Sequence, residues 1–304
     1  MNHRTILLAN LISTAVCCAQ VDTPQDPAKR PSPEDAAKAV AAMFEAFEAQ
    51  GLKVDPAAGT ITIPTVVSRP DQPLEYLLIH RRGKAHEAMF MTEVKASVLN
   101  GAFLALGWAP GDNARVVDRE PMPTREEVEA GAPIFDVFPP KGMPVWFTAR
   151  WTRIDAEGNE LEVELPVEDL LLDLSTEQTI ASTEWVYLGG RMAPLNRNEP
   201  PVFVADYDGN YISIVYKTPS NHLVTMSHER AFDDQIWWVS DLMPMPGTEV
   251  ELIVHRQRTK LHEERAERIA EREAKAAGEA AGEAADETGG DASGKPPASE
   301  ERKG

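Results

Sequence analysis

Hydrophobic and polar positions alternate along much of the chain between residues 60 and 255, which predicts a structure rich in β-strands. The clearest example is 143–165, where two alternating runs flank a turn sequence at 155–159. Alternation of this kind is typical of antiparallel strands with one face on the core and one in water. The turn sequence at 81–84 indicates that two of the strands form a β-hairpin. We expect further strands at 60–67, 74–80, 86–94, 183–188, 201–206, 210–216 and 248–255.

Two segments carry apolar residues at helical spacing instead. Ser32 and Pro33 are a favourable start for the first helix, which ends near Gly51. The second is expected to begin at Ser97 and to end at Gly107. The expected buried faces are Ala37, Val40, Ala41, Phe44 and Phe47 in the first helix, and Val98, Leu99, Ala102, Phe103 and Leu106 in the second.

Between these elements, 109–142 holds six prolines and little periodicity, so we expect a long loop with one helical turn near 125–130. The fold class is therefore α+β, a mainly antiparallel sheet with two short packed helices. The core spans 32–257, either as one unit or as two subdomains, 32–111 and 142–257. From 258 to 304 a charged, low-complexity tail follows, helical to about 277 through i,i+4 pairs and disordered beyond.

The amino terminus has the pattern of an export signal. A basic start, an apolar run over 6–16 and small residues before Gln20 predict a signal peptide at 1–19, cleaved after Ala19, followed by a linker at 20–31. The apolar run is too short to span a bilayer. The alternative is lipid attachment at Cys17 or Cys18, although the residues before Cys17 match a lipobox poorly. We expect an exported protein that is either periplasmic or secreted. The alternative is a protein anchored to the envelope by a lipid, and we expect no other contact with a membrane.

The amino-acid composition excludes several kinds of chemistry and one class of partner. The chain has two cysteines, and cleavage after Ala19 removes both, which excludes disulfides, an iron–sulfur cluster and a thiol nucleophile. The formal charge of −19 argues against a nucleic-acid partner, because such proteins present a basic face to the phosphates. We expect no cofactor.

A set of short segments resembles one bacterial family. The set comprises Glu75-Tyr76-Leu77-Leu78, the residues at 83–88, Thr92, Leu106-Gly107 and Pro110-Gly111, with further pieces at 142–145, 184–187, 205–206 and 246–248. Together they resemble the YdjY domain, a family of uncharacterised exported proteins, over about 52–255. The resemblance implies no activity or cofactor for this chain. Some members are labelled ferredoxin-like, and this chain departs from that label because its core has no cysteine.

His86 and Glu87 are the first candidates for a metal or acid–base site. The segment is not an H-E-x-x-H motif, because position 90 is Phe. In a strand, adjacent side chains point to opposite faces, so the pair would not converge on one ion. His80 shares a face with His86 only if the hairpin loop has three residues and a bulge, and a two-residue loop separates them. These two histidines are the weak metal candidates.

Two further features have alternative interpretations. Arg81, Arg82 and Lys84 form a basic tip, either an anion site or a solvated turn. Asp206 and Asp208 match part of a calcium loop, but Lys217 stands where its closing glutamate would be, so we interpret this segment as a turn.

The sequence contains no G-x-S-x-G, P-loop or Rossmann motif. We therefore expect a binding or envelope-associated module and favour a non-enzymatic role. The sequence leaves open whether the protein also has a catalytic activity. Its partner would be an envelope or extracellular protein or a small ligand. The alternative is a metal-binding or hydrolase-like protein that uses His86 with nearby polar residues.

Overall fold

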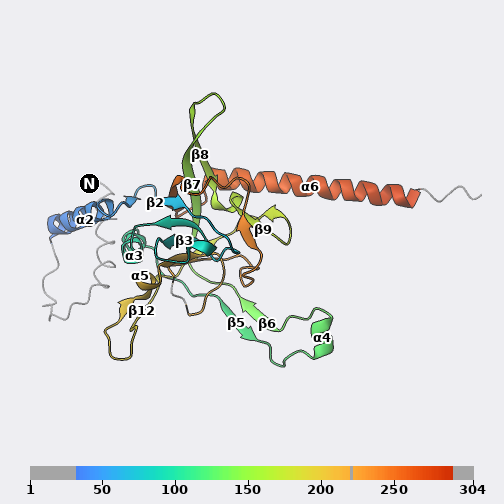
Figure 1. Cartoon of the computed structure of the whole chain (residues 1–304), viewed down its shortest axis with the longest axis horizontal. Helices are drawn as coiled ribbons and strands as arrows, with labels where there is room; N and C mark the ends of the chain where they lie inside the picture. Colours follow the sequence, from blue (N-terminus) through green and yellow to red (C-terminus); the bar gives the residue numbers. More distant parts are fainter. Residues whose placement is uncertain (1–31, 220–221, 290–304) are drawn as a thin grey trace, which may run out of the picture.

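The computed structural model describes residues 32–219 and 222–289. The expected signal peptide (1–19), the linker (20–31) and the end of the tail (290–304) lie outside the described residues. Within them the fold is rich in sheet, with five α-helices and a closed barrel of eight strands (Figure 1). No helix in the described ranges combines the length and apolar character needed to cross a membrane.

The barrel closes because β4 pairs with both β3 and β2. Its strands come from both 32–111 and 142–257, the ranges considered above as possible subdomains, so the two parts share one sheet. Six of the eight neighbouring pairs are antiparallel, which confirms the mainly antiparallel expectation. In spatial order the strands are β2 (Thr60–Val67), β17 (Glu249–His255), β7 (Pro144–Ile154), β11 (Trp185–Tyr187), β15 (Val224–Met226), β14 (Asn210–Ser213), β3 (Tyr76–His80) and β4 (Ala88–Thr92).

Several shorter strands extend or flank the barrel. Two of them lengthen the main sheet: β1 (Lys53–Asp55) on β2, and β8 (Glu160–Pro166) on β7. A three-stranded sheet contains β10 (Gln178–Thr179), β9 (Leu171–Asp173) and β16 (Trp237–Val239), and the two hairpins are β12 (Met192–Ala193) with β13 (Val202–Phe203), and β5 (Arg115–Asp118) with β6 (Phe135–Phe138).

The expected hairpin between β3 and β4 is wrong, because the two strands run parallel. β14 occupies the antiparallel position beside β3, and the chain crosses back through a turn at Gly83 and the 3₁₀-helix η2 (Ala85–Glu87). A Cβ on Gly83 would lie 2.5 Å from the carbonyl oxygen of Gly209, so this return segment is pressed against the start of β14. His86 consequently lies in a 3₁₀-helix and not in a strand.

One apolar cluster joins the barrel strands to α3 (Ala96–Ala105). Phe103 stacks on Tyr187 with ring centroids 4.6 Å apart, and Phe147 meets Trp185 edge-on at 5.3 Å. The buried face expected for this helix is confirmed, with Val98 only partly buried. Its cap differs from the prediction: the N-cap residue is Lys95, and the Ser97 amide donates at 3.0 Å to Asp206.

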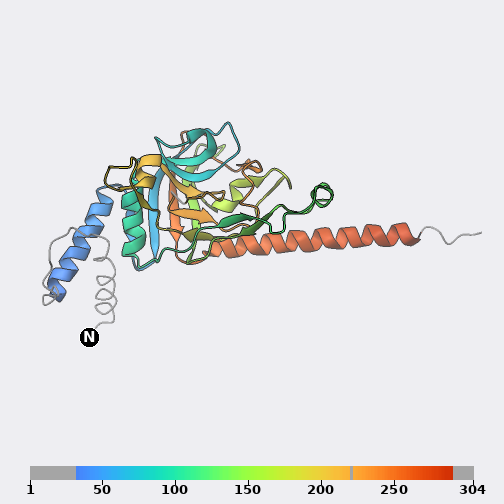
Figure 2. The same cartoon turned by 90° about the horizontal axis from the view of Figure 1, so that it is seen from below.

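The first helix, α2 (Pro33–Glu48), begins as predicted, with the Ser32 side chain accepting from the Asp35 amide. Its packing differs from the expectation. Only Phe47 is buried, while Ala37 and Ala41 are exposed, so the helix contacts the body mainly through its last turn and extends away from it (Figure 2).

The strand expected at 201–206 is only partly present, because α5 (Val204–Asp208) replaces its second half. Gly209 ends α5 in the left-handed conformation, at φ 73°, and so the predicted turn serves as a helix C-cap.

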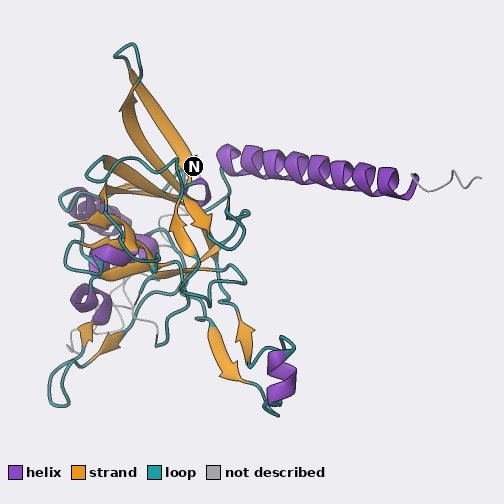
Figure 3. Ribbon diagram, turned by 45° about the vertical axis from the view of Figure 1, so that its right-hand side comes forward, coloured by secondary structure: helices purple, strands orange, loops and turns teal. Residues whose placement is uncertain are grey.

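Besides α2, several elements project from the barrel, and three of them are long (Figures 1 and 3). The β7–β8 hairpin confirms the prediction for 143–165. The expected long loop is an arm built from β5, α4 (Arg125–Glu129) and β6, with the helical turn where it was predicted. The last, α6 (Lys260–Gly289), is helical beyond the expected end near 277, and its first turns bury one face, which carries His262 and Arg265, where a solvated helix was expected.

Candidate functional site

Three of the predicted candidates, Lys84, His86 and Glu87, gather around Glu75 at the start of β3. Lys84 Nζ lies 2.9 Å from Glu75 Oε2 and 2.8 Å from Glu87 Oε2. Lys217 Nζ lies 2.5 Å from the other oxygen of Glu75. His86 is attached at the rim, with Nε2 3.5 Å from Glu87 Oε1. Glu75 and Lys217, which the sequence analysis did not propose as site residues, are therefore the centre of this cluster.

The charges of this cluster are paired with one another: Lys84 and Lys217 both contact Glu75, and Lys84 also contacts Glu87. Burial would raise the pKa of Glu75, but hydrogen bonds from Lys217 and Lys84 outweigh it and lower the pKa to about 2. Burial would lower the pKa of Lys84, but Glu87 and Glu75 outweigh it and raise that pKa. Both ammonium groups also lie within 6 Å of the Tyr76 ring centroid, at 5.8 and 5.9 Å. Because both lysines are held by carboxylates, the cluster does not present them to an anion.

The other predicted candidates form a separate group. Arg81 Nε lies 2.7 Å from Glu93 Oε1, and His80 Nε2 lies 3.9 Å from Glu93 Oε2. His80 Nδ1 accepts from the Arg82 amide at 3.2 Å. The structure therefore places His80 and His86 in different clusters. In the part of the chain that the structure describes, no three His, Cys, Asp or Glu side chains are placed to hold a metal ion.

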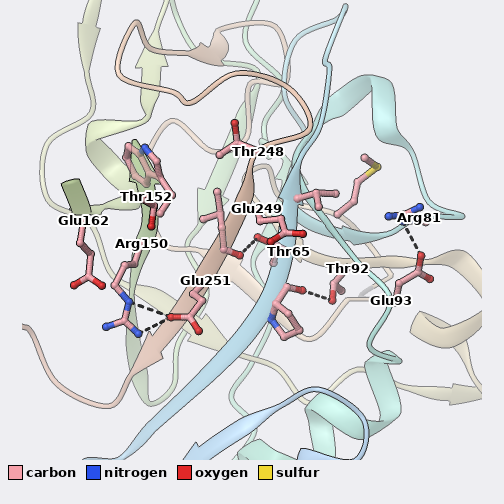
Figure 4. A pocket seen from close by; sticks show the side chains of 15 residues that line it. Thr65, Arg81, Thr92, Glu93, Arg150, Thr152, Glu162, Thr248, Glu249 and Glu251 are labelled. Carbon is pink, nitrogen blue, oxygen red and sulfur yellow. Dashed lines mark hydrogen bonds and ion pairs between the residues drawn. The ribbon is translucent and has the colours of Figure 1, made fainter. Parts of the chain in front are cut away.

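A groove of about 750 Å³ crosses the outer face of the sheet where β7 and β17 separate (Figure 4). The two strands pair from Trp146↔His255 to Arg150↔Glu251, and their pairing ends there. Beyond that point 151–154 still pair with β8 on one edge, whereas the other edge has no partner strand among the described residues. The wall carries Thr65, Arg81, Thr92, Glu93, Arg150, Thr152, Glu162, Thr248, Glu249 and Glu251, with Pro64, Val66, Met91, Trp151 and Val250 as apolar surface.

Ion pairs hold the two ends of this groove. Arg150 Nη2 donates to Glu251 Oε2 at 2.6 Å, and Arg81 pairs with Glu93 at the far side. Glu162 and Glu249, both exposed, form no side-chain hydrogen bond or ion pair with the residues that the structure describes. The groove therefore has an excess of negative charge.

The arm carries the largest set of exposed apolar side chains. Its base is closed by paired backbone hydrogen bonds between Asp112 and Lys141, at 2.7 and 3.0 Å. Seven large apolar side chains on it are between 38% and 57% exposed: Val116, Val117, Met122, Val128, Ile134, Phe135 and Phe138. In the β5–β6 ladder these side chains lie on both faces, with Val116 and Phe135 on one and Val117 and Phe138 on the other.

A buried polar cluster lies where α6 meets the 3₁₀-helix η3 (Val167–Asp169). Glu168, His262 and Arg265 are at most 2% exposed. Trp185 Nε1 donates to Glu168 Oε1 at 3.3 Å, and Arg265 Nε donates to Asp169 Oδ1 at 2.5 Å. Arg265 Nη2 also donates to the Ile180 carbonyl at 2.5 Å. These contacts fix the first turns of α6 to the barrel.

Sequence reasoning missed this cluster as well. The only signal was the spacing of Leu261, Arg265 and Ile269, which lie on one face of α6. Because charged residues surround these three positions, the sequence pattern of this segment could not be distinguished from that of a solvated helix.

Comparison of the chain with family models, with curated proteins and with solved structures found no match.

Proposed function

We propose that this chain is an exported, non-enzymatic binding module that docks onto a partner protein through its β5–α4–β6 arm. The observation that carries the proposal is the set of seven exposed apolar side chains on a segment held away from the barrel (Figure 3). Exposed patches with polar residues around them are typical of protein–protein contacts. Export through the signal at 1–19 and the resemblance to the YdjY family are parts of the same proposal.

The base of the arm is built to hold it in one direction. The Gly111 amide donates to the Tyr187 carbonyl of the barrel at 2.8 Å. Gly111 and Gly142 cross so closely that a Cβ on Gly111 would lie 2.4 Å from the Lys141 carbonyl oxygen. A fixed base lowers the entropy that binding would otherwise cost, because the arm is presented already ordered.

Charge on the arm indicates the chemistry of its partner. Its arginines are already engaged: Arg119 with Asp136 at 2.9 Å, and Arg125 with Glu129 at 2.7 Å. Arg115 lies over the Phe138 ring at 5.0 Å. The acidic side chains Asp118, Glu120 and Glu126 have no such partner among the described residues. The surface therefore suits a protein with an apolar patch bordered by lysine or arginine.

The test is photo-crosslinking in cells, with a benzophenone amino acid replacing Val116, which shares a face of the β5–β6 hairpin with Phe135, in the full chain. We expect one defined adduct with a second protein. The variant Phe135→Lys should reduce its yield more than tenfold, because it removes an aromatic contact and places a positive charge before a basic partner, a loss in the range of roughly 2 kcal/mol for an interface anchor.

The matched control places the same probe at Glu157, an exposed position at the tip of the β7–β8 hairpin. It should give no such adduct. Equal adducts at both positions would contradict the proposal, and an adduct between two copies of this chain would show that the arm serves self-association instead.

A further inference from the structure

We infer that the groove between β7 and β17 binds an extended peptide segment with a basic side chain, which adds to the free edge of β7 as an extra strand. This site is independent of the arm. An unpaired strand edge presents backbone N–H and C=O groups that an extended chain can satisfy, as in binding by β-strand addition.

The register of the sheet shows where that strand would enter. Arg150 and Glu251 form the last pair between β7 and β17. A continued ladder would set Thr152 opposite Glu249, two residues further along, but the strands have separated by then. The edge of β7 is free over Trp151–Ile154, which at about 3.4 Å per residue offers roughly 14 Å to an added strand. A segment of about four or five residues matches this length.

Two carboxylates define the preference for a basic side chain. On β8, Glu162 is the cross-strand partner of Thr152, and on β17 Glu249 lies at the same level across the gap (Figure 4). The side chain between them, Thr152, is small and exposed. A lysine or arginine entering at this level therefore meets a carboxylate on either side.

The rest of the groove does not fully neutralise these acids, although Arg150 interacts electrostatically with Glu162. Arg150 is held by Glu251 and has Glu164 at 3.7 Å, and Arg81 is held by Glu93. Two arginines and four glutamates line the groove, which leaves a net charge of −2. An acidic peptide would be repelled there, whereas a basic one complements the surface.

Apolar surface in the same groove would receive apolar side chains of the segment. Trp151 and Val250 line the gap but are almost fully buried, at 8% and 2% exposure, so the apolar surface that a ligand can reach is that of Pro64, Val66 and Met91. Valine or threonine side chains of the bound segment would contact this surface.

The probe is a labelled nine-residue peptide of alternating threonine, valine and lysine, titrated into the full chain and followed by fluorescence anisotropy and by amide NMR. We expect saturable binding with shifts confined to 151–154 and the facing residues of β17. A peptide with glutamate in place of lysine, or with a central proline, should bind at least tenfold more weakly. The first reverses the charge, and the second removes a backbone donor.

The matched pair of protein variants tests the carboxylates. Glu162→Gln with Glu249→Gln should weaken binding about fivefold at low salt, in the range for two exposed ion pairs. Glu45→Gln with Glu48→Gln removes the same charge from α2 and should leave binding unchanged. The arm variant Phe135→Lys should also leave it unchanged, which separates this inference from the proposed function.

Three results would overturn the inference. One is equal binding of the lysine and glutamate peptides, and another is an equal effect of the two double variants. The third is slow hydrogen exchange in the free protein at those amides of 151–154 that point away from β8, which would show that a second copy or another part of this chain already covers the edge.

Discussion

Glu168 and His262 face each other inside the protein, with Glu168 Oε2 3.8 Å from His262 Nε2. The carboxyl comes from η3 and the imidazole from α6, and both are at most 1% exposed. Burial raises the pKa of Glu168 to about 7, with Arg265 opposing, and burial lowers the pKa of His262 to about 4. Both shifts favour the neutral form of each group, so the two side chains lie against each other between α6 and η3 without a buried ion pair.

The two groups have opposite effects on stability against pH. The pKa of Glu168 is raised above 4.5, so its contribution is complete below pH 4.5 and is lost as the pH rises toward 7. The pKa of His262 is lowered from 6.5, so its contribution is complete above pH 6.5 and is lost as the pH falls toward 4.

The variant Glu168→Gln separates these effects, because it retains an acceptor for Trp185 and cannot ionise. Its free energy of unfolding relative to wild type should rise by about 3 kcal/mol as the pH increases from 4.5 to 7. Urea unfolding at several pH values measures this. Parallel curves for the two proteins would show that Glu168 titrates normally.

Arg265→Ala should lower the free energy of unfolding by about 3–5 kcal/mol, because it leaves Asp169 and the Ile180 carbonyl without their donor in a buried site. Arg268→Ala is the matched control. Arg268 reaches the same Asp169 at 3.6 Å but is 60% exposed, so its loss should cost less than about 1 kcal/mol. Similar costs for the two variants in urea unfolding would contradict the buried attachment of α6.

Gly111→Ala should destabilise the fold by about 1–3 kcal/mol, since its Cβ would meet the Lys141 carbonyl oxygen at 2.4 Å. The clash lies at the base of the arm, so amide exchange should increase in β5 and β6 first. Gly278→Ala, in open space on α6, is the control and should be neutral or slightly stabilising. Unchanged exchange in the arm would argue against the tight crossing.

Lys217→Gln should reduce the stability that Glu75 contributes above pH 4.5. The pKa of Glu75 is lowered from 4.5 to about 2, so its contribution is present above pH 4.5 and is lost as the pH falls toward 2. The variant should therefore lose about 1 kcal/mol above pH 4.5 and differ little from wild type near pH 2. Lys38→Gln, which breaks an exposed pair with Glu34, should be close to neutral throughout.

The proposed export predicts the chemical form of the mature amino terminus. Cleavage after Ala19 leaves Gln20 as the first residue and a chain without cysteine. Mass spectrometry of protein recovered from cells measures this directly. A diacylglyceryl group on Cys17 or Cys18 would show lipid attachment instead, and an intact Met1 would contradict both forms of export.

Elements with strong local patterns were the ones the sequence predicted best. The expected strand at 60–67 matches β2, and the expected 248–255 differs from β17 by one residue. The hairpin at 81–84 failed for a non-local reason. Its turn residues were suitable, but β14, more than 100 residues away, takes the edge of β3 that a hairpin partner would need.

The candidate site was harder to predict, because its main residues are polar groups whose burial depends on tertiary contacts. Lys217 was considered only as a defect in a calcium motif, although it pairs with Glu75 across the fold. Likewise, the groove exists because β7 and β17 separate after Arg150 and Glu251, and neither strand has a local signal that marks this point.

Because the first turns of α6 are attached to the barrel, the rest of the helix extends from the barrel over a defined length. Ile269, Arg272 and Glu273 of this helix line a cavity together with residues of the body, and the helix continues from there to Gly289. At 1.5 Å per residue the part after Glu273 measures about 24 Å. A helix whose first turns are fixed to the barrel acts as a spacer, so insertion or deletion of whole helical turns would change how far the end of the helix lies from the barrel without altering the barrel itself.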